Sequence, residues 1–162
     1  MRIEGFVDIK DNSEFFIAAV EAAAERALDA AGMQAASACA RELQRSPSRI
    51  DTGLLRNSIT WAVGGKSAAI SSYSADRPSR HMNEDSVWSV LQAARPSSGS
   101  YSGTAPADTD KTRSVYIGTN VEYAIYVHEG TKHMTANHFL KNGISKNRSK
   151  LTEIMKTILQ SG

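Results

Sequence analysis

The longest regular pattern in the chain is an alanine-rich stretch over residues 14–45. Alanine has the highest helix propensity, and apolar side chains recur here at steps of three and four, as on one face of a helix. This face carries Phe16, Val20, Ala23, Ala27 and Ala31. The pattern predicts one long helix whose small side chains allow close approach to another element or to another copy of the chain. Gly32 then marks either a bend or a close contact.

Two short strands are predicted on either side of a serine-rich region. Residues 58–63 and 113–120 each alternate apolar and polar side chains, which is the period of a half-buried strand. A single helical turn over residues 53–57, which Asp51 or Thr52 can cap, precedes the first strand.

Two further helices are expected in the C-terminal part of the chain. Residues 121–129 predict a short helix that Gly130 is placed to end in a left-handed conformation. Its expected core face carries Val121, Ala124, Ile125 and His128. Residues 139–160 predict a final helix with apolar residues at the spacing of a buried stripe. This stripe comprises Leu151, Ile154, Met155, Ile158 and Leu159.

Residues 66–112 interrupt this regularity, because they are rich in serine and contain three of the four prolines. Such a composition is typical of a long surface excursion, within which residues 85–94 predict a short helix. A loop this long in a small domain is usually functional or disordered. We expect an insertion that becomes ordered only against a partner.

Together these elements predict an α+β fold with a single domain over residues 1–162, a length that fits one domain. A long N-terminal helix and a C-terminal helix pack on a small, mostly antiparallel sheet, with residues 66–112 as a long loop insertion. Residues 1–10 suggest a short strand or an extended arm. No run of about 18 apolar residues exists, so no membrane span is expected.

Charge is distributed unevenly along the chain, although the formal net charge is only +2. Residues 1–46 carry five basic and eight acidic side chains, whereas residues 111–162 carry eight basic and three acidic ones. Opposite charges of this kind can attract each other within a subunit or between neighbouring subunits, or can remain as two solvated faces.

Candidate catalytic and metal-binding chemistry is sparse. His128, His133 and His138 lie close in sequence but without HExxH spacing. Glu129 follows His128 directly, and adjacent side chains on a helix diverge by about 100°. The single cysteine, Cys39, excludes an intramolecular disulfide, and its alanine-rich surroundings predict a small buried side chain. We therefore expect no metal and no cofactor.

Other enzyme signatures are also missing. No Gly-x-Ser-x-Gly motif follows an apolar strand, and no phosphate-binding loop is present, so we expect no enzyme. Three histidines converging on one point would change that expectation. Lys146, Arg148 and Lys150 form a basic face on the final helix, which is either solvated or in contact with an acidic partner or DNA.

Two segments, in this order, carry a recognisable pattern. The first is DTGLLRNSI at residues 51–59, and the second is VYIGTNVEYAIYVHEGT at residues 115–131. Met134, Ala136 and the run His138-Phe139-Leu140 follow. The pattern resembles the tailed-phage (siphophage) neck or tail-completion family, the gene-ten-like minor tail proteins of lambdoid phages. The chain departs from that pattern at residues 128–129, where the family usually shows a glutamate followed by an aromatic, at His138, which replaces a proline, and in the length of residues 66–112.

The resemblance implies a structural virion protein at the head–tail junction rather than an enzyme. It would form a ring, expected to be a hexamer, that joins connector or stopper proteins of the head to the tail terminator or tail tube protein. DNA would pass through the lumen without sequence-specific binding. The protein would be assembled in the bacterial host cytoplasm and reside in the tail or neck of the virion.

The alternatives are a tail terminator and a DNA-contacting binding module, which would use the basic final helix together with Arg49, Arg56 and Arg113. In the leading interpretation, charged groups brace turns or contact partners, and tyrosines supply rigid amphipathic contact area. The interface candidates are Asp51, Arg56, Tyr123, Tyr126, His128, Lys146, Arg148 and Lys150.

Overall fold

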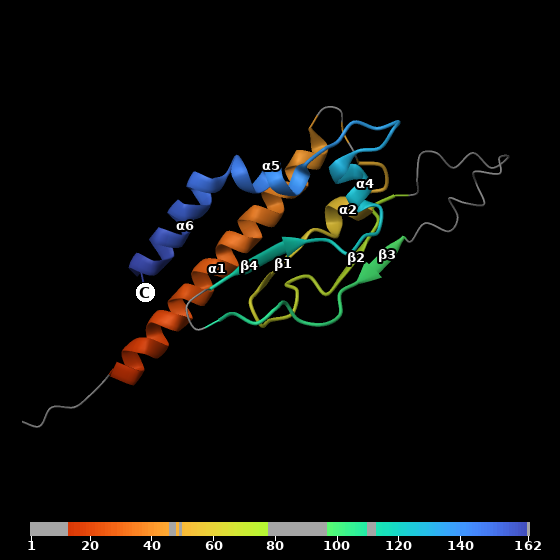
Figure 1. The fold of residues 1–162 in the computed structure, drawn as a ribbon. Helices are drawn as coiled ribbons and strands as arrows, with labels where there is room; N and C mark the ends of the chain where they lie inside the picture. Colours follow the sequence, from red (N-terminus) through yellow and green to blue (C-terminus); the bar gives the residue numbers. More distant parts are fainter. Residues whose placement is uncertain (1–12, 46–47, 49, 78–96, 110–112, 162) are drawn as a thin grey trace, which may run out of the picture.

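Helix α1 (Ser13–Gln44) is the longest element and runs the length of the molecule (Figure 1). Strands β1 (Thr60–Val63) and β4 (Val115–Gly118) lie along one side of it, and helices α5 (Phe139–Ser145) and α6 (Arg148–Ser161) along the other. The long N-terminal helix and the α+β class are therefore confirmed. The computed structural model describes residues 13–45, 48, 50–77, 97–109 and 113–161.

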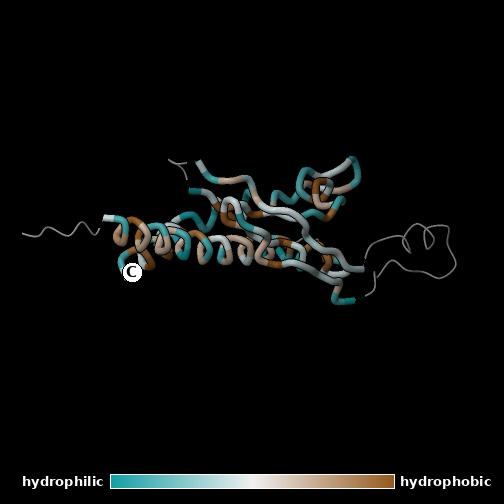
Figure 2. The backbone as a smooth tube through the Cα atoms, turned by 90° about the horizontal axis from the view of Figure 1, so that it is seen from below, coloured by the Kyte–Doolittle hydropathy of each residue, from teal (hydrophilic) through white to brown (hydrophobic). Residues whose placement is uncertain are grey.

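The apolar face of α1 is buried over only part of its length. Ala23, Ala27 and Ala31 are buried, whereas Phe16 and Val20 on the same face are exposed. The first turns of α1 extend beyond the strands and beyond α6 (Figure 1). Figure 2 shows that this end of the molecule, near the C-terminal end of α6, is rich in apolar positions.

Gly32 marks a close contact with the sheet. A Cβ atom at this position would lie 2.5 Å from Cδ1 of Trp61 and 2.8 Å from Cγ2 of Val115. The absence of a side chain thus allows β1 and β4 to pack directly on α1. The indole of Trp61 also donates a hydrogen bond of 2.8 Å to the Asp29 carboxylate on α1.

The strands form two antiparallel pairs. In the first pair, Thr60 of β1 faces Gly118 of β4 and Val63 faces Val115. In the second, β2 (Ser72–Ser74) pairs with β3 (Ser98–Ser100). Gly118 at the end of β4 has no positive φ, and a Cβ there would meet no atom within 4 Å.

The second strand pair lies within the 66–112 region. Two of its described parts, residues 66–77 and 97–109, pair with each other. Ser67 and Thr104 form a further, isolated antiparallel bridge between these two parts. The expectation that the region becomes ordered against a partner stays a prediction. The helix predicted over residues 85–94 and the arm predicted over residues 1–10 lie outside the described residues.

Helix α2 (Leu54–Asn57) is the predicted single turn. Gly53 precedes it with φ of 85°, a left-handed conformation that favours glycine, and the Thr52 hydroxyl accepts a hydrogen bond of 3.2 Å from the backbone N–H of Leu54. Leu54 and Leu55 both enter the core.

Helix α4 (Ala124–Glu129) differs in detail from its prediction. Val121 and Ala124 are buried as expected, but Val127 joins the core in place of Ile125, which is 62% exposed. Gly130 has the positive φ expected of it, 81°, but its ψ of 176° is extended rather than left-handed helical. The chain therefore leaves α4 in an extended conformation.

The predicted final helix is broken into α5 and α6. In a continuous helix the Gly143 carbonyl would accept the backbone N–H of Asn147, but here it accepts the Asn147 side-chain amide at 2.8 Å. The Asn147 backbone N–H turns to the Ile144 carbonyl instead. None of the residues of α6 is buried, so the expected stripe is half-buried at most, and Leu159 is exposed.

The core lies where α1, α2, α4 and α5 meet. It is built from small and medium apolar side chains, with Phe139, Leu43 and Cys39 fully buried. The full cluster is Ala36, Cys39, Leu43, Leu54, Leu55, Ile59, Val121, Ala124, Val127 and Phe139. Over the part of the chain that the structure describes, no helix has both the length and the apolar character to cross a membrane.

Candidate functional site

The two motif segments meet in the core. Leu54 and Leu55 of the first segment pack in one cluster with Val121, Ala124 and Val127 of the second. Phe139, which follows the second segment, completes this cluster. The apolar positions of the pattern therefore build the fold, and the functional candidates are the polar and exposed side chains around them.

Arg56 is held within the subunit. Its guanidinium forms an ion pair with Asp76 and donates a hydrogen bond of 3.0 Å to the Asn57 side chain. Asn57 in turn donates to Asp76 at 2.7 Å. The backbone carbonyl of Asp51 accepts a bond of 2.8 Å from Arg77. These contacts join the first motif to the base of the 66–112 region, so Arg56 stabilises the fold around α2.

A tyrosine network joins the same region to the second motif. Tyr101 donates to the Ser58 carbonyl, and the hydroxyls of Ser58 and Thr119 share a hydrogen bond of 2.6 Å. Tyr73 donates to the Asn120 side chain at 2.6 Å, and its ring lies 5.4 Å from that of Tyr101. Burial raises the pKa of Tyr101 above its usual value. This network was not predicted, because both tyrosines stand alone among serines with no periodic signal.

The tyrosines of α4 have different surroundings. Tyr123 is partly buried against the core, whereas Tyr126 is 60% exposed beside exposed Ile125. These two exposed side chains form what we call the α4 patch, Ile125 and Tyr126. Tyr126 therefore remains available for contact with another molecule.

The basic residues of the last helices also fall into two groups, one paired within the subunit and one exposed. Lys146 binds the buried Glu42 carboxylate at 2.8 Å, and Arg45 binds its other oxygen at 3.0 Å. Arg148 and Lys150 are exposed and form no ion pair with another described residue. Lys146 thus links α1 to the end of α5, while Arg148 and Lys150 remain free on the surface.

The acidic side chains of α1 also find partners inside the subunit. Glu21 accepts from Arg113 at 3.0 Å, and Glu25 forms an ion pair with Lys66. Together with the Glu42–Lys146 pair, these contacts show that several acidic side chains of α1 are paired with basic side chains of the same chain.

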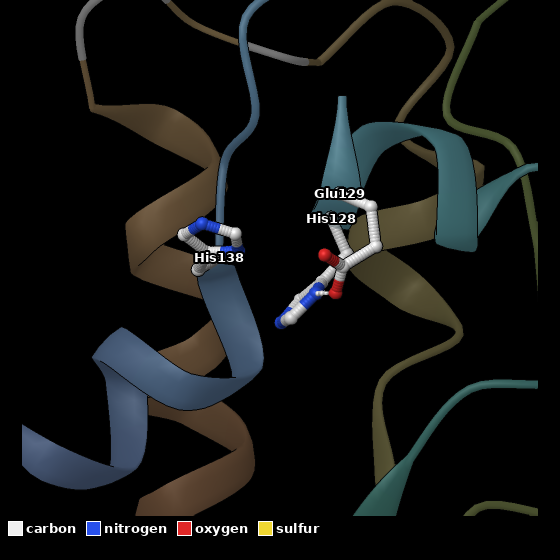
Figure 3. A group of neighbouring side chains, drawn as sticks. All are labelled: His128, Glu129 and His138. Atoms are coloured by element: carbon white, nitrogen blue, oxygen red, sulfur yellow. Dashed lines mark hydrogen bonds and ion pairs between the residues drawn. The ribbon is translucent and has the colours of Figure 1, made fainter. Parts of the chain in front are cut away.

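Three polar side chains, His128, Glu129 and His138, lie together where α4 ends and α5 begins (Figure 3). His128 Nδ1 and Glu129 Oε1 are 2.7 Å apart, and the two imidazole rings are 5.2 Å apart in an edge-on arrangement. His133 does not belong to this group. The expectation that His128 and Glu129 point apart is wrong, because both lie at the last turn of α4, where the Glu129 side chain is free to fold back.

Electrostatics favour the charged form of Glu129. The hydrogen bond from His128 is the largest influence and lowers the pKa of the Glu129 carboxyl; desolvation opposes it, and the nearby His128, His138 and Lys141 lower the pKa further. The His128 imidazole also packs against the buried Phe139 ring, with 5.4 Å between the ring centroids. His128 lines a cavity of about 290 Å³.

A second exposed apolar surface lies at the opposite end of the molecule. Four large side chains in the first turns of α1 are 48–82% exposed, and we call them the α1 patch. They are Phe15, Phe16, Ile17 and Val20. The sequence placed Phe16 and Val20 on the packing face of α1 but carried no signal that the rest of the fold stops short of them.

Comparisons with known proteins add no relative: no family model, curated protein or solved structure matches this chain.

Proposed function

We propose that this chain is a structural virion protein of the phage head–tail junction, a tail-completion or neck protein that assembles with its own copies into a ring, expected to be a hexamer. The resemblance of residues 51–59 and 115–131 to that family supports the class of protein. In this role it joins connector or stopper proteins to the tail terminator or tail tube protein, surrounds the DNA path and catalyses no reaction.

The observation that carries the self-assembly is the α1 patch. Phe15 and Phe16 are 82% and 72% exposed, although they continue a helix whose next turns are buried. Contiguous exposed apolar side chains of this size are typical of protein–protein interfaces. A second copy of the chain that covers the patch would continue the burial of α1 to its N-terminal end.

The position of the two patches favours a head-to-tail arrangement. The α1 patch lies at one end of the elongated molecule, and α4, with its patch of Ile125 and Tyr126, lies near the other (Figure 1). A closed ring requires two different surfaces on each subunit, whereas a twofold dimer uses one surface twice. Two separate apolar patches meet the requirement of a ring.

The test is the assembly state of three variants of the full chain. Phe16→Ser with Val20→Ser disrupts the α1 patch by removing two of its four apolar side chains, and Ile125→Ser with Tyr126→Ser removes the α4 patch. Met33→Ser is the control, since Met33 is an exposed apolar residue of α1 outside both patches. We expect wild type and control to form rings in light-scattering and negative-stain measurements, alone or with connector and tail proteins. Each double variant should remain monomeric.

Mixing the two double variants distinguishes the arrangements. Each retains the patch that the other lacks, so a head-to-tail interface gives a weak dimer, seen at high protein concentration, that cannot grow further. A wild-type chain that stays monomeric even with its connector and tail partners would contradict the proposed function. Double variants that assemble like wild type would show that the patches are not the interface.

The structure offers less support for a DNA-binding module. Two of the arginines that such a module would use, Arg56 and Arg113, are already paired with Asp76 and Glu21. Arg148 and Lys150 alone provide few phosphate contacts, so we expect weak DNA affinity with a shallow dependence on salt.

A further inference from the structure

Three potential metal ligands lie together at the junction of α4 and α5. His128 and His138 each offer a ring nitrogen and Glu129 a carboxylate oxygen, and one such atom from each residue lies within 4.8 Å of the other two. Figure 3 shows the His128 ring and the Glu129 carboxylate side by side at the end of α4, with His138 facing them from the start of α5. Two imidazoles and a carboxylate are a donor set that binds zinc and related ions.

The backbone that brings these residues together is well fixed. The loop from Gly130 to His138 is closed by hydrogen bonds from the Asn137 N–H to the Val127 carbonyl, at 2.9 Å, and between Thr131 and Met134. A Cβ at Gly130 would lie 2.7 Å from the backbone nitrogen of Ala136, so the loop is tightly packed on itself. The two histidines are therefore positioned before any ligand arrives, which lowers the entropic cost of binding.

The geometry points to a binding site for a single divalent transition-metal ion, with zinc as the expected occupant and His128, Glu129 and His138 as its protein ligands. Ligand atoms around a tetrahedral zinc ion lie about 3.4 Å apart, given metal–ligand bonds of about 2.0–2.1 Å. To reach this spacing, the 2.7 Å contact between His128 Nδ1 and Glu129 Oε1 would lengthen, and the wider separations of up to 4.8 Å would shorten. The Glu129 side chain is 63% exposed and is therefore the ligand with the most freedom to adjust.

The fourth coordination position would be open to water. His128 lines a cavity of about 290 Å³ between α4 and α5, and its side chain remains 20% exposed. Three protein ligands with an accessible fourth position can bind metal reversibly. In this fold the ion would fasten the end of α4 to the start of α5, since His128 and Glu129 belong to α4 and His138 directly precedes α5.

The experiment is a titration of the tag-free full chain with Zn²⁺ alone, followed by calorimetry, and with Co²⁺ alone, followed by its visible absorption. Glu129→Gln and His138→Gln each remove one ligand while preserving size. His133→Gln is the matched control, because His133 is an exposed histidine of the same loop outside the group. Circular dichroism verifies that each variant is folded. His128 is left intact, because its ring packs against Phe139.

We expect one ion per chain, with Glu129→Gln and His138→Gln each weakening affinity at least about tenfold and His133→Gln leaving it unchanged. The Co²⁺ spectrum of wild type should show the intense bands of a four-coordinate site and lose them in both ligand variants. No binding by wild type, equal binding by the ligand variants, or a comparable loss in His133→Gln would each overturn the assignment. None of these results depends on whether the chain forms rings.

Discussion

Substitution of Gly143 by alanine tests the packing of α5 on α1. A Cβ at this position would lie 2.6 Å from both Cα and Sγ of Cys39 and 2.7 Å from the Cys39 backbone nitrogen. Restoring an ordinary contact of about 3.4 Å requires the two helices to separate by roughly 0.8 Å, because backbone atoms, unlike a flexible side chain, cannot turn aside. The crossing lies beside fully buried Leu43 and Phe139, so separation also loosens the centre of the core.

Two opposing effects decide whether Gly143→Ala raises or lowers the free energy of unfolding. Alanine is favoured over glycine in a helix by up to about 1 kcal/mol, and this alone would stabilise the variant. Overpacking of a close-packed core costs about 1–3 kcal/mol, and more where backbone must move. We therefore expect Gly143→Ala to lower the free energy of unfolding by about 1–2 kcal/mol. In a chain of this size each kcal/mol lowers Tm by about 2–4 °C.

Urea denaturation followed by circular dichroism measures this difference. Gly118→Ala is the matched control, because a Cβ there meets no atom within 4 Å and the position has no positive φ, and it should change stability by less than about 0.5 kcal/mol. In a Cys39→Ala background the Gly143→Ala penalty should persist, since the backbone contacts remain. A Gly143→Ala variant as stable as wild type would refute the close crossing of α1 and α5.

Three further predictions concern buried and partly buried polar groups. Lys146→Met should destabilise the fold by about 1–2 kcal/mol in urea denaturation, because it removes one partner of the buried Glu42 carboxylate, while Lys150→Met should have no effect. Burial raises the pKa of the Cys39 thiol to about 11, so at pH 8 its thiolate fraction is about a hundredfold below that of an unfolded thiol, and Ellman's reagent should react only after denaturation. Because the folded pKa is raised, stability should fall as pH rises from about 9 to 11, and Cys39→Ala should flatten that fall; a profile unchanged by the substitution would contradict it. Tyr101→Phe, which loses the bond to Ser58, should cost about 1 kcal/mol in the same denaturation assay, and an unaltered midpoint would show that this bond contributes nothing.

The elements with a strong period were predictable from sequence. The alanine-rich pattern predicted α1, and alternation predicted β1 and β4, because side-chain burial on one face imposes these periods. Gly130 was recognised as a special backbone position, and its φ is positive. These features depend on interactions that are local or repeated along the chain.

The break between α5 and α6 could not be predicted in that way. Helical periodicity continues across it, but the Asn147 side chain competes with its own backbone N–H for the Gly143 carbonyl. The burial of Val127 in place of Ile125 likewise depends on the direction from which Phe139 and α2 reach α4. Such outcomes are decided by tertiary packing, which periodicity alone does not contain.

The histidine group illustrates the same limit at a candidate site. His128 and His138 are ten positions apart, and their meeting depends on the extended exit of the chain at Gly130 and on the closed loop that follows. His133, which the sequence places between them, is not part of the group. Proximity in sequence therefore selected the right stretch of chain but could not identify the residues that converge.

The lengths of the elements explain why α1 carries an uncovered apolar surface. At 1.5 Å per residue, its 32 residues extend about 48 Å, whereas residues 139–161 extend at most about 34 Å. The difference of about 14 Å corresponds to nine or ten residues, and residues 13–22 are indeed all exposed. No repacking of α5 and α6 can cover both ends of α1, so among the described residues the exposure of the α1 patch follows from the relative lengths of these helices.

The free energy gained by burying the α1 patch indicates how copies of the chain associate. Burial of the four side chains of the α1 patch, about two-thirds exposed on average, would contribute on the order of 4–8 kcal/mol. Association of two subunits costs on the order of 4–15 kcal/mol in translational and rotational freedom, so one patch alone supports at best a weak dimer. In a closed ring every subunit contributes two interfaces, and closure adds the final contacts without a further loss of freedom. The proposed assembly should therefore appear as complete rings and monomers, with few open intermediates, and a ladder of stable dimers and trimers would be inconsistent with head-to-tail closure.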